Sequence, residues 1–350
     1  KHSDAVRVLI EAGAEVNARS HSGFSPLVFA ARVGDVESAD ALLAAGADIE
    51  ASDEHGMTPL IMASVSGQED VGLFLLEKGA DPNARDQNGA SALHYTVLMG
   101  ITALNEIRYA NYTDYIFRPS LKELAGALVE RGAELNYQFT RMPAVGGDRE
   151  RAGIGASPLL LAAASPDPAM MRLFYEAGAD PALSTASNLT PLMAAAGLSR
   201  GQDYTEEEKV LALEAVRLLV EWGADVNAAN DDGLTALHGA AVNGANEIVR
   251  YLVEHSATMD VWDHYQQTPL SIALGMRLPW IPYGDELGEI IQPHTAELLL
   301  ELGATPVDSP GYFNPPGDDS DVYRINQGQR FESIGAPSDG SLRASPQPAR

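Results

Sequence analysis

The sequence predicts an all-α-dominated repeat solenoid, in which pairs of short helices stack one after another. Two motifs lead to this prediction, because both recur along most of the 350 residues and stay in register with each other. One is Gly-Ala followed by an acidic residue, and the other is Ser or Thr followed by Pro or Ala and then Leu. Neighbouring copies of the first motif lie 33 residues apart at three junctions, a period typical of solenoids built from one helical unit.

The Ser/Thr motif predicts the start of a short helix in each unit. A Ser or Thr hydroxyl caps the first turn, and Pro is favoured at the first helical position because its missing N–H is not needed there. An Ala-rich helix follows, then a Gly turn and a longer second helix with apolar residues at helical spacing. The motif begins at Ser25, Thr58, Ser91, Ser157, Thr190, Thr235 and Thr268.

The Gly-Ala motif predicts the end of the second helix. Glycine is favoured at this position because it adopts the left-handed backbone conformation that closes a helix. Asp-x-x-Gly, as in 53–56, then predicts a tight turn between units. Ser256-Ala257 and Gly303-Ala304 are degenerate copies of the Gly-Ala motif. The complete copies begin at Gly13, Gly46, Gly79, Gly132, Gly178 and Gly223.

The 33-residue period, with Thr-Pro-Leu-His-like and Gly-Ala-Asp-x-Asn-like motifs, resembles the ankyrin repeat. The resemblance covers residues 1–305 and implies two antiparallel helices and a projecting β-hairpin per unit. Each unit then contacts only its neighbours, so residues 1–305 are expected to form one cooperative domain. A half unit at 1–19 is followed by seven units, which start near residues 20, 53, 86, 152, 185, 230 and 263.

Four insertions interrupt the period, near 100–119, 140–152, 198–209 and 276–292. Three of them fall at the helix–helix turn of alternate units, and the one at 140–152 lengthens a hairpin. Aromatic side chains in the first and last insertions have two interpretations: a small core that packs against the solenoid itself, or a surface that contacts a ligand or partner. These residues are Tyr109, Tyr112, Tyr115, Phe117, Trp280 and Tyr283.

The two ends of the chain depart from the pattern. Residues 306–350 are rich in Pro, Gly, Ser and Asp, and predict a disordered tail. The chain opens inside a helical pattern, so we expect a segment upstream of it, including any targeting signal. The compartment is therefore unknown from the sequence, although the absence of cysteine favours export from a bacterium to the periplasm or the extracellular space.

Composition and motifs argue against several classes of function. A net charge of -26 repels the phosphates of nucleic acids, and no apolar stretch is long enough to insert into a membrane. The sequence contains no thiol nucleophile, His-Glu-x-x-His motif or phosphate-binding loop. We therefore predict no enzyme, with no catalytic residue, cofactor or metal ligand. His94 and His238 occupy the motif position at which the family uses imidazole for structural hydrogen bonds.

The resemblance implies a binding surface on the concave face, built from hairpin tips and the exposed side of each short helix. We predict a monomeric protein-binding scaffold or adaptor with a basic or polar protein partner, because an acidic surface attracts positive charge. The alternative is that the insertions form a pocket for a small molecule or glycan, or support a separate enzyme. The candidate contact residues on the concave face are Phe24, His55, Met57, Leu98, Met99 and Tyr265.

Overall fold

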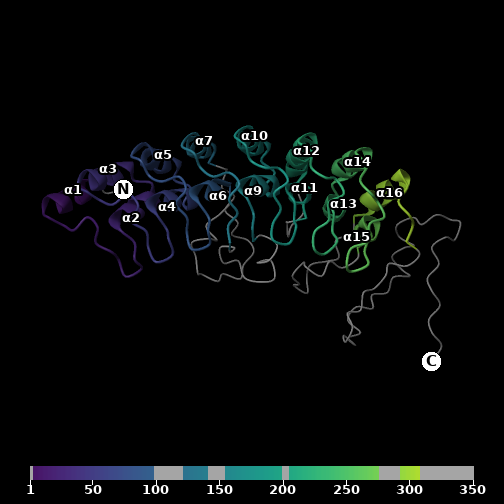
Figure 1. Ribbon diagram of the computed structural model, residues 1–350, viewed down its shortest axis with the longest axis horizontal. Helices are drawn as coiled ribbons and strands as arrows, with labels where there is room; N and C mark the ends of the chain where they lie inside the picture. Colours follow the sequence, from purple (N-terminus) through teal and green to yellow (C-terminus); the bar gives the residue numbers. More distant parts are fainter. Residues whose placement is uncertain (1–2, 98–120, 141–153, 199–204, 276–291, 308–350) are drawn as a thin grey trace, which may run out of the picture. The chain divides into compact units, whose positions relative to one another are not determined.

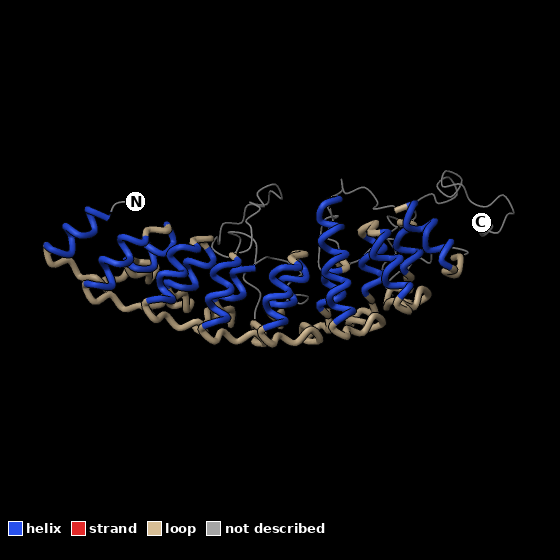
Figure 2. Tube along the Cα trace, turned by 90° about the horizontal axis from the view of Figure 1, so that it is seen from above, coloured by secondary structure: helices blue, strands red, loops and turns tan. Residues whose placement is uncertain are grey.

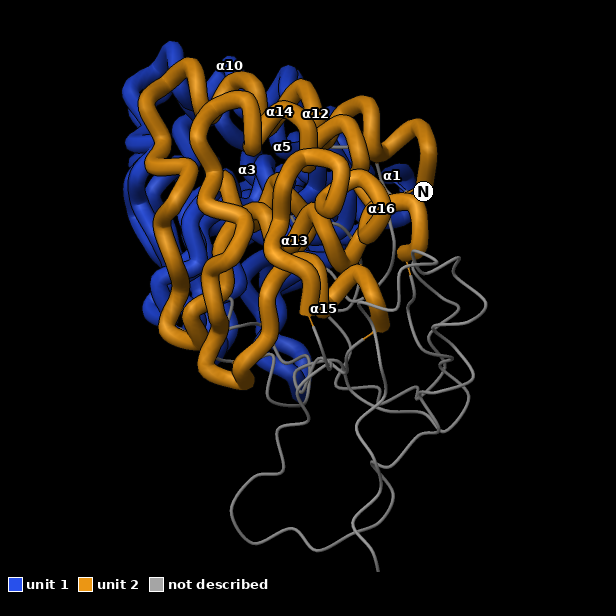
Figure 3. Tube along the Cα trace, turned by 90° about the vertical axis from the view of Figure 1, so that its right-hand side faces the viewer, with its two compact units in different colours: residues 1–191 blue, residues 192–350 orange. Residues whose placement is uncertain are grey.

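The computed structural model describes residues 3–97, 121–140, 154–198, 205–275 and 292–307 (Figure 1). Within these ranges the chain consists of helices and loops, as predicted (Figure 2). The loops expected as hairpins contain a single isolated β-bridge in the described part, between Arg85 and Ser91, and no extended ladder. The chain divides into two compact units, residues 1–191 and 192–350 (Figure 3).

Unit 1 contains two rows of helices in contact with each other (Figure 1). Each helix also contacts its neighbour along its own row, so each repeat packs on the next. The row of short helices consists of α2 (Pro26–Val33), α4 (Pro59–Val65), α6 (Ala92–Val97) and α9 (Pro158–Ala164). The second row consists of α1 (Ser3–Glu11), α3 (Val36–Ala44), α5 (Glu69–Glu77), α7 (Lys122–Glu130) and α10 (Pro168–Glu176).

Unit 2 repeats this arrangement, and the boundary between the units falls within α11 (Pro191–Ala195). The short helices α13 (Ala236–Val242) and α15 (Pro269–Ala273) contact each other. The second row consists of α12 (Glu206–Glu221), α14 (Asn246–Glu254) and α16 (Pro293–Leu302).

The predicted helix starts are confirmed. The hydroxyl of Ser25 accepts a hydrogen bond from the backbone N–H of Val28, and that of Thr58 accepts one from Ile61. The Leu that follows each cap is buried, because it lies on the side of the short helix that faces the neighbouring repeat. Leu27, Leu60, Leu159, Leu192, Leu237 and Leu270 are all at most 1% exposed.

The predicted helix ends are also confirmed. The glycines of the complete Gly-Ala copies have φ angles between 83° and 103°, in the left-handed region. Ser256 takes the same conformation in a degenerate copy, with a φ of 72°. The motif therefore determines the backbone conformation at this turn even where glycine is replaced.

The insertion predicted at 198–209 requires a correction. Residues 206–209 are the first turn of α12, a helix of 16 residues, and not part of an inter-helix loop. The cause is a capping box: Thr205 accepts from the N–H of Glu208, and the Glu208 carboxylate accepts from the N–H of Thr205. Residues 100–119, 199–204, 276–291 and 308–350 lie outside the described residues, as does the predicted hairpin insertion after Thr140.

Candidate functional site

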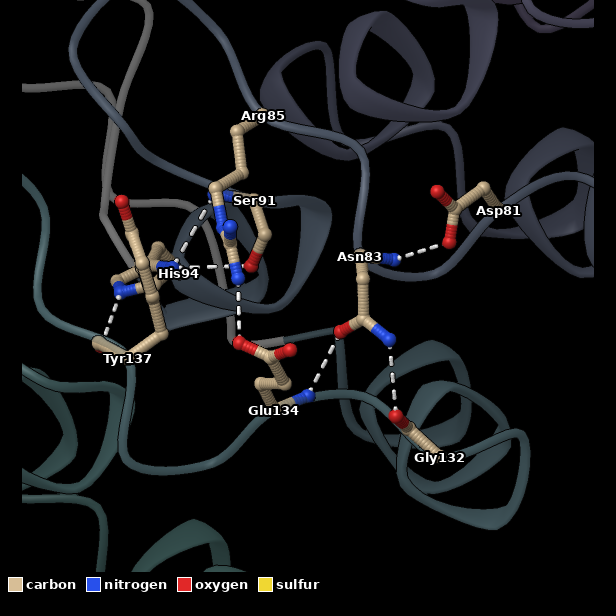
Figure 4. Close-up of polar contacts among 8 residues, drawn as sticks. All are labelled: Asp81, Asn83, Arg85, Ser91, His94, Gly132, Glu134 and Tyr137. Atoms are coloured by element: carbon tan, nitrogen blue, oxygen red, sulfur yellow. Dashed lines mark hydrogen bonds and ion pairs between the residues drawn. The ribbon is translucent and has the colours of Figure 1, made fainter.

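Asparagine side chains in the loops fasten successive repeats together. Asn83 donates from Nδ2 to the carbonyl of Gly132 at 3.0 Å, and its Oδ1 accepts from the N–H of Glu134 at 2.8 Å (Figure 4). The carboxylate of Asp81 accepts from the N–H of Asn83 at 2.9 Å. One amide thus satisfies a carbonyl and an N–H directly after the second-row helix of the neighbouring repeat. The loop is therefore held by directional bonds.

This clamp recurs at three other loops, in both units. Asn17 binds Gly46 and Asp48, Asn136 binds Gly178 and Asp180, and Asn227 binds Ser256 and Thr258. Glu50 and Asp260 occupy the same position in two more loops, where Glu50 accepts from the N–H of Asp81 and Asp260 accepts from both the N–H and the hydroxyl of Thr305. The Asn of the Gly-Ala-Asp-x-Asn motif is therefore a framework residue.

The two buried histidines have structural roles, as predicted. Nδ1 of His94 accepts from the N–H of Ser91 at 3.2 Å, so the proton of the neutral ring lies on Nε2 and is donated to the carbonyl of Tyr137 at 3.1 Å (Figure 4). Burial lowers the pKa of His94 to about 4, although the Tyr137 hydrogen bond favours the charged form. The Tyr137 contact ties α6 to the next loop, and the Ser91 contact lies within the first turn of α6.

His238 repeats the first half of this arrangement. Its Nδ1 accepts from the N–H of Thr235 at 3.1 Å, and burial lowers its pKa to about 4. The backbone groups of Gln267 and Val261 lie beside the ring and favour its charged form, but burial outweighs them. A neutral ring with these contacts fits a structural position, and both rings lie too deep to act on a substrate.

Where a loop turn begins with aspartate, the carboxylate accepts hydrogen bonds from the turn itself. Oδ1 of Asp86 accepts from the N–H groups of Asn88 and Ala90, and Oδ2 accepts from the hydroxyl of Tyr95 at 2.6 Å. Burial raises the pKa of Tyr95, so its hydroxyl remains a hydrogen-bond donor. Asp53 and Asp263 accept the corresponding backbone bonds in their loops. These carboxylates stabilise turns and do not form a catalytic pair.

Four of the predicted contact residues fall within the described part. Phe24 is half-buried and packs edge-on against Phe29, with ring centroids 5.8 Å apart. His55 is exposed at its loop tip, where Nδ1 lies 3.0 Å from Oε1 of Gln87 in the next loop. Met57 and Tyr265 are half-buried. Outside the described residues lie Leu98, Met99, Tyr109, Tyr112, Tyr115, Phe117, Trp280 and Tyr283.

Sequence reasoning missed the exposure of Trp262 and Phe29. Trp262 is 58% exposed in a loop of unit 2, and Phe29 is 43% exposed on α2. A signal for Trp262 was available, because it directly precedes the turn aspartate, as Arg19 precedes Ser20 and Arg85 precedes Asp86 in the other loops. The sequence has no equivalent signal for Phe29, whose exposure depends on what packs beside α2.

The described residues contain no group of three or more His, Asp or Glu side chains placed to hold a metal ion. None of the helices within the described ranges is both long and apolar enough to cross a membrane.

Comparison with known proteins finds one repeat family in this chain. A family model for ankyrin repeats (three copies) matches residues 1–86 and 208–282. Among solved structures, the crystal structure of the human ASB11 ankyrin repeat domain is similar, with a TM-score of 0.56 and 19% sequence identity. That match covers 81% of this chain and 100% of the other, and at this identity it shows the fold alone.

Curated relatives resemble shorter segments. The palmitoyltransferase Hip14 of Drosophila melanogaster is 35% identical over 107 residues, which are 30% of this chain and 15% of that protein. Ankyrin repeat and SOCS box protein 16 of Mus musculus is 34% identical over 118 residues, 34% of this chain and 25% of that protein. The Notch-regulated ankyrin repeat-containing protein of Homo sapiens is 56% identical over 41 residues, 12% of this chain and 36% of that protein. The matches therefore span 15% to 36% of these relatives' length.

Proposed function

The chain is an ankyrin-repeat protein, and on this basis we propose that it is a protein-binding scaffold or adaptor. Ankyrin repeats are generally modules for protein–protein interaction. The proposed binding surface, called the loop face below, consists of the loop tips and the short-helix sides next to them. In the described residues these tips are 20–24, 53–57, 86–90 and 185–189 in unit 1, and 230–234 and 263–267 in unit 2.

One observation carries this proposal: the framework side chains recur from repeat to repeat, whereas the exposed residues of the loop tips vary. The Asn clamps, buried histidines and turn aspartates bind neighbouring backbone groups in repeat after repeat. The tips between them differ in chemistry from one repeat to the next. Exposed tip residues include His21, Glu54, His55, Gln87, Asp231 and His264. A constant frame with variable exposed tips supports recognition of a specific protein surface.

Charge supports a basic or polar partner for this loop face. The chain has a net charge of -26, and acidic surfaces accelerate the approach of basic proteins. We propose that the chain itself is not an enzyme, because the buried carboxylates and histidines of the described part are engaged in turns and helix caps. The alternative, a pocket formed by the insertions, depends on residues outside the described part, and no described residue favours it.

The test is affinity capture of partner proteins with the purified chain, followed by mass spectrometry and binding measurements on each captured protein. We expect Met57→Ala and Tyr265→Ala, made singly and together, to weaken binding because half-buried apolar tips are typical interface anchors. The combined loss should exceed about tenfold at an unchanged melting temperature.

A control variant replaces exposed residues of two second-row helices, with Glu77→Ala on α5 and Glu254→Ala on α14. This control should bind the partner as the unmodified chain does. The proposal is wrong if the control variant loses binding and the loop-face variants retain it.

A further inference from the structure

Helix α12 is longer than the other second-row helices of unit 2. It has 16 residues, whereas α14 has 9 and α16 has 10. All three helices end within two residues of the Gly-Ala motif or a degenerate copy of it. The additional length therefore lies at the start of α12, where the capping box of Thr205 and Glu208 begins the helix early. It extends the helix by roughly two turns, about 10 Å.

The added turns expose two apolar side chains. Val210 is 67% exposed, more than any other large apolar side chain in the described part of the chain, and Leu211 is 42% exposed. The first buried residue of α12 is Ala212, so residues 206–211 extend beyond the part of the helix that packs within the repeat. Because Val210 and Leu211 bury little surface in the fold, they contribute little to its stability. They are instead available as anchors for another molecule.

Negative charge lies one helical turn before this apolar pair. Glu207 is exposed and precedes Val210 by three residues and Leu211 by four, which places it on the same side of the helix. Lys209 forms an ion pair with Glu206 at 2.9 Å. With three Glu and one Lys, the first turn of α12 keeps a net negative charge. Acidic residues also stabilise the start of a helix, so the apolar pair is the feature that the fold does not require.

The exposed pair lies far from the loop face of the same unit. A helix of 16 residues spans about 24 Å, and the C-terminal end of α12 leads directly into the loop that begins at Gly223. The start of α12 is therefore at the opposite end of the helix from the loop segment that carries the tip 230–234. A molecule bound to that tip leaves the start of α12 accessible.

We propose that Glu207, Val210 and Leu211, called the α12 surface, bind an amphipathic helix of a second protein partner, with Lys or Arg beside its apolar face. Packed helices contact each other through side chains one turn apart, and the three residues have this spacing. The apolar pair provides the buried contact, and the carboxylate attracts a basic side chain of the partner helix. The α12 surface is separate from the loop face and does not depend on it. One chain could thus join two proteins.

The experiment uses the full chain and a dye-labelled helical peptide with Leu on one face and Lys on its flanks. A scrambled peptide of the same composition and a peptide with Glu in place of Lys are the matched probes. Fluorescence anisotropy at an ionic strength of about 0.15 M measures affinity while salt screens long-range attraction to the acidic chain. The scrambled and Glu peptides should bind several-fold more weakly than the amphipathic Lys peptide.

Variants of the α12 surface test the residues themselves. We expect Val210→Gln with Leu211→Gln to weaken binding of the amphipathic peptide about tenfold. Glutamine retains helix propensity, so the melting temperature should be unchanged. Glu207→Gln should weaken binding about threefold, because an exposed ion pair contributes modestly.

Matched controls lie elsewhere on the chain. Leu300→Gln replaces an apolar residue that is 40% exposed on α16, and Glu254→Gln removes an exposed carboxylate from α14. Each should change the affinity by less than about twofold. Met57→Ala with Tyr265→Ala, the loop-face variant, should bind the peptide as the unmodified chain does.

Several outcomes would overturn the proposal. These are absence of binding by the amphipathic peptide, equal affinity for the scrambled peptide, unchanged affinity in the variant of Val210 and Leu211, and an equal loss in Leu300→Gln. Loss of peptide binding in the loop-face variant would also overturn it while leaving the proposed function in place. Sedimentation velocity tests the other occupant: a dimer that the variant of Val210 and Leu211 abolishes would assign the α12 surface to a second copy of this chain.

Discussion

Three residues other than glycine take the left-handed backbone conformation at positions where the repeat usually has glycine. Within the described ranges, Asn188, Ser256 and Gln266 have φ angles of 60°, 72° and 58°. Other repeats have glycine at the corresponding positions, because a Cβ atom is strained in this conformation. These residues are held there by the surrounding clamps and turns, so the replacement costs stability without changing the fold.

The first prediction concerns Ser256, which ends α14 where Gly223 ends α12. We expect Ser256→Gly to raise the free energy of unfolding by about 1 kcal/mol, because relief of strain exceeds the added freedom of the unfolded chain. Urea unfolding followed by circular dichroism measures this change. The reverse substitution, Gly223→Ser, should lower stability by a similar amount. A Ser256→Gly variant no more stable than the unmodified chain would contradict the strain argument.

The second prediction concerns the pH dependence of stability. Because burial lowers the pKa of His94 from 6.5 to about 4, the unfolded state binds a proton in this interval that the native state excludes. The contribution of neutral, buried His94 to the free energy of unfolding is fully present above pH 6.5. It is lost as pH falls towards 4, by about 1.4 kcal/mol per pH unit. His238 contributes in the same direction.

Urea unfolding at several values between pH 7 and pH 4.5 measures this slope. His94→Gln should be less stable at pH 7, because the bonds to Ser91 and Tyr137 are disturbed. It should also show a smaller loss on acidification than the unmodified chain. An unchanged slope in the variant would mean that His94 does not titrate as its burial implies.

Close packing at the scale of helices depends on small residues. Gly239 in α13 lies so near residues 196–198 that an added Cβ would be 3.0 Å from the backbone N of Leu198 and 3.1 Å from the carbonyl O of Ala196. Both neighbours are backbone atoms, which cannot rotate away. Glycine at this point therefore permits the contact between α13 and the segment after α11.

The third prediction follows from that contact. Gly239→Ala should lower the free energy of unfolding by about 2 kcal/mol, because backbone must shift to admit the methyl group. Gly126 in α7 is a matched control, since a Cβ there meets no atom within 4 Å. Gly126→Ala should raise stability by about 0.5–1 kcal/mol through helix propensity. Thermal melts of both variants provide the comparison, and a loss of stability in both would contradict the packing argument.

At the scale of the whole molecule, each repeat depends on the one beside it. Leu60 is 1% exposed on α4, which contacts both α2 and α6. Val33 on α2 is 55% exposed at the side of the same short-helix row. A charge at the first position must be buried between repeats, whereas a charge at the second remains in water.

The fourth prediction compares these two positions. Leu60→Asp should cost several kcal/mol and expose the amides of α2, α4 and α6 to hydrogen exchange, because an unpaired carboxylate is buried. Val33→Asp should leave exchange in these helices nearly unchanged. Mass-spectrometric hydrogen exchange resolves both effects. Normal protection of α4 in Leu60→Asp would show that the repeat register is wrong.

The sequence by itself determined the repeat, its helix starts and its helix ends, because caps and left-handed turns depend on residues close together in the chain. The capping box of Thr205 and Glu208 is equally local, because the two residues that form it lie three positions apart in the chain. The tertiary structure decided which apolar residues face solvent. Phe29 and Met62 occupy the same position of successive short helices, yet Phe29 is 43% exposed and Met62 is fully buried. Their burial depends on the neighbouring repeat, so no local pattern in the sequence predicts the exposure of Phe29.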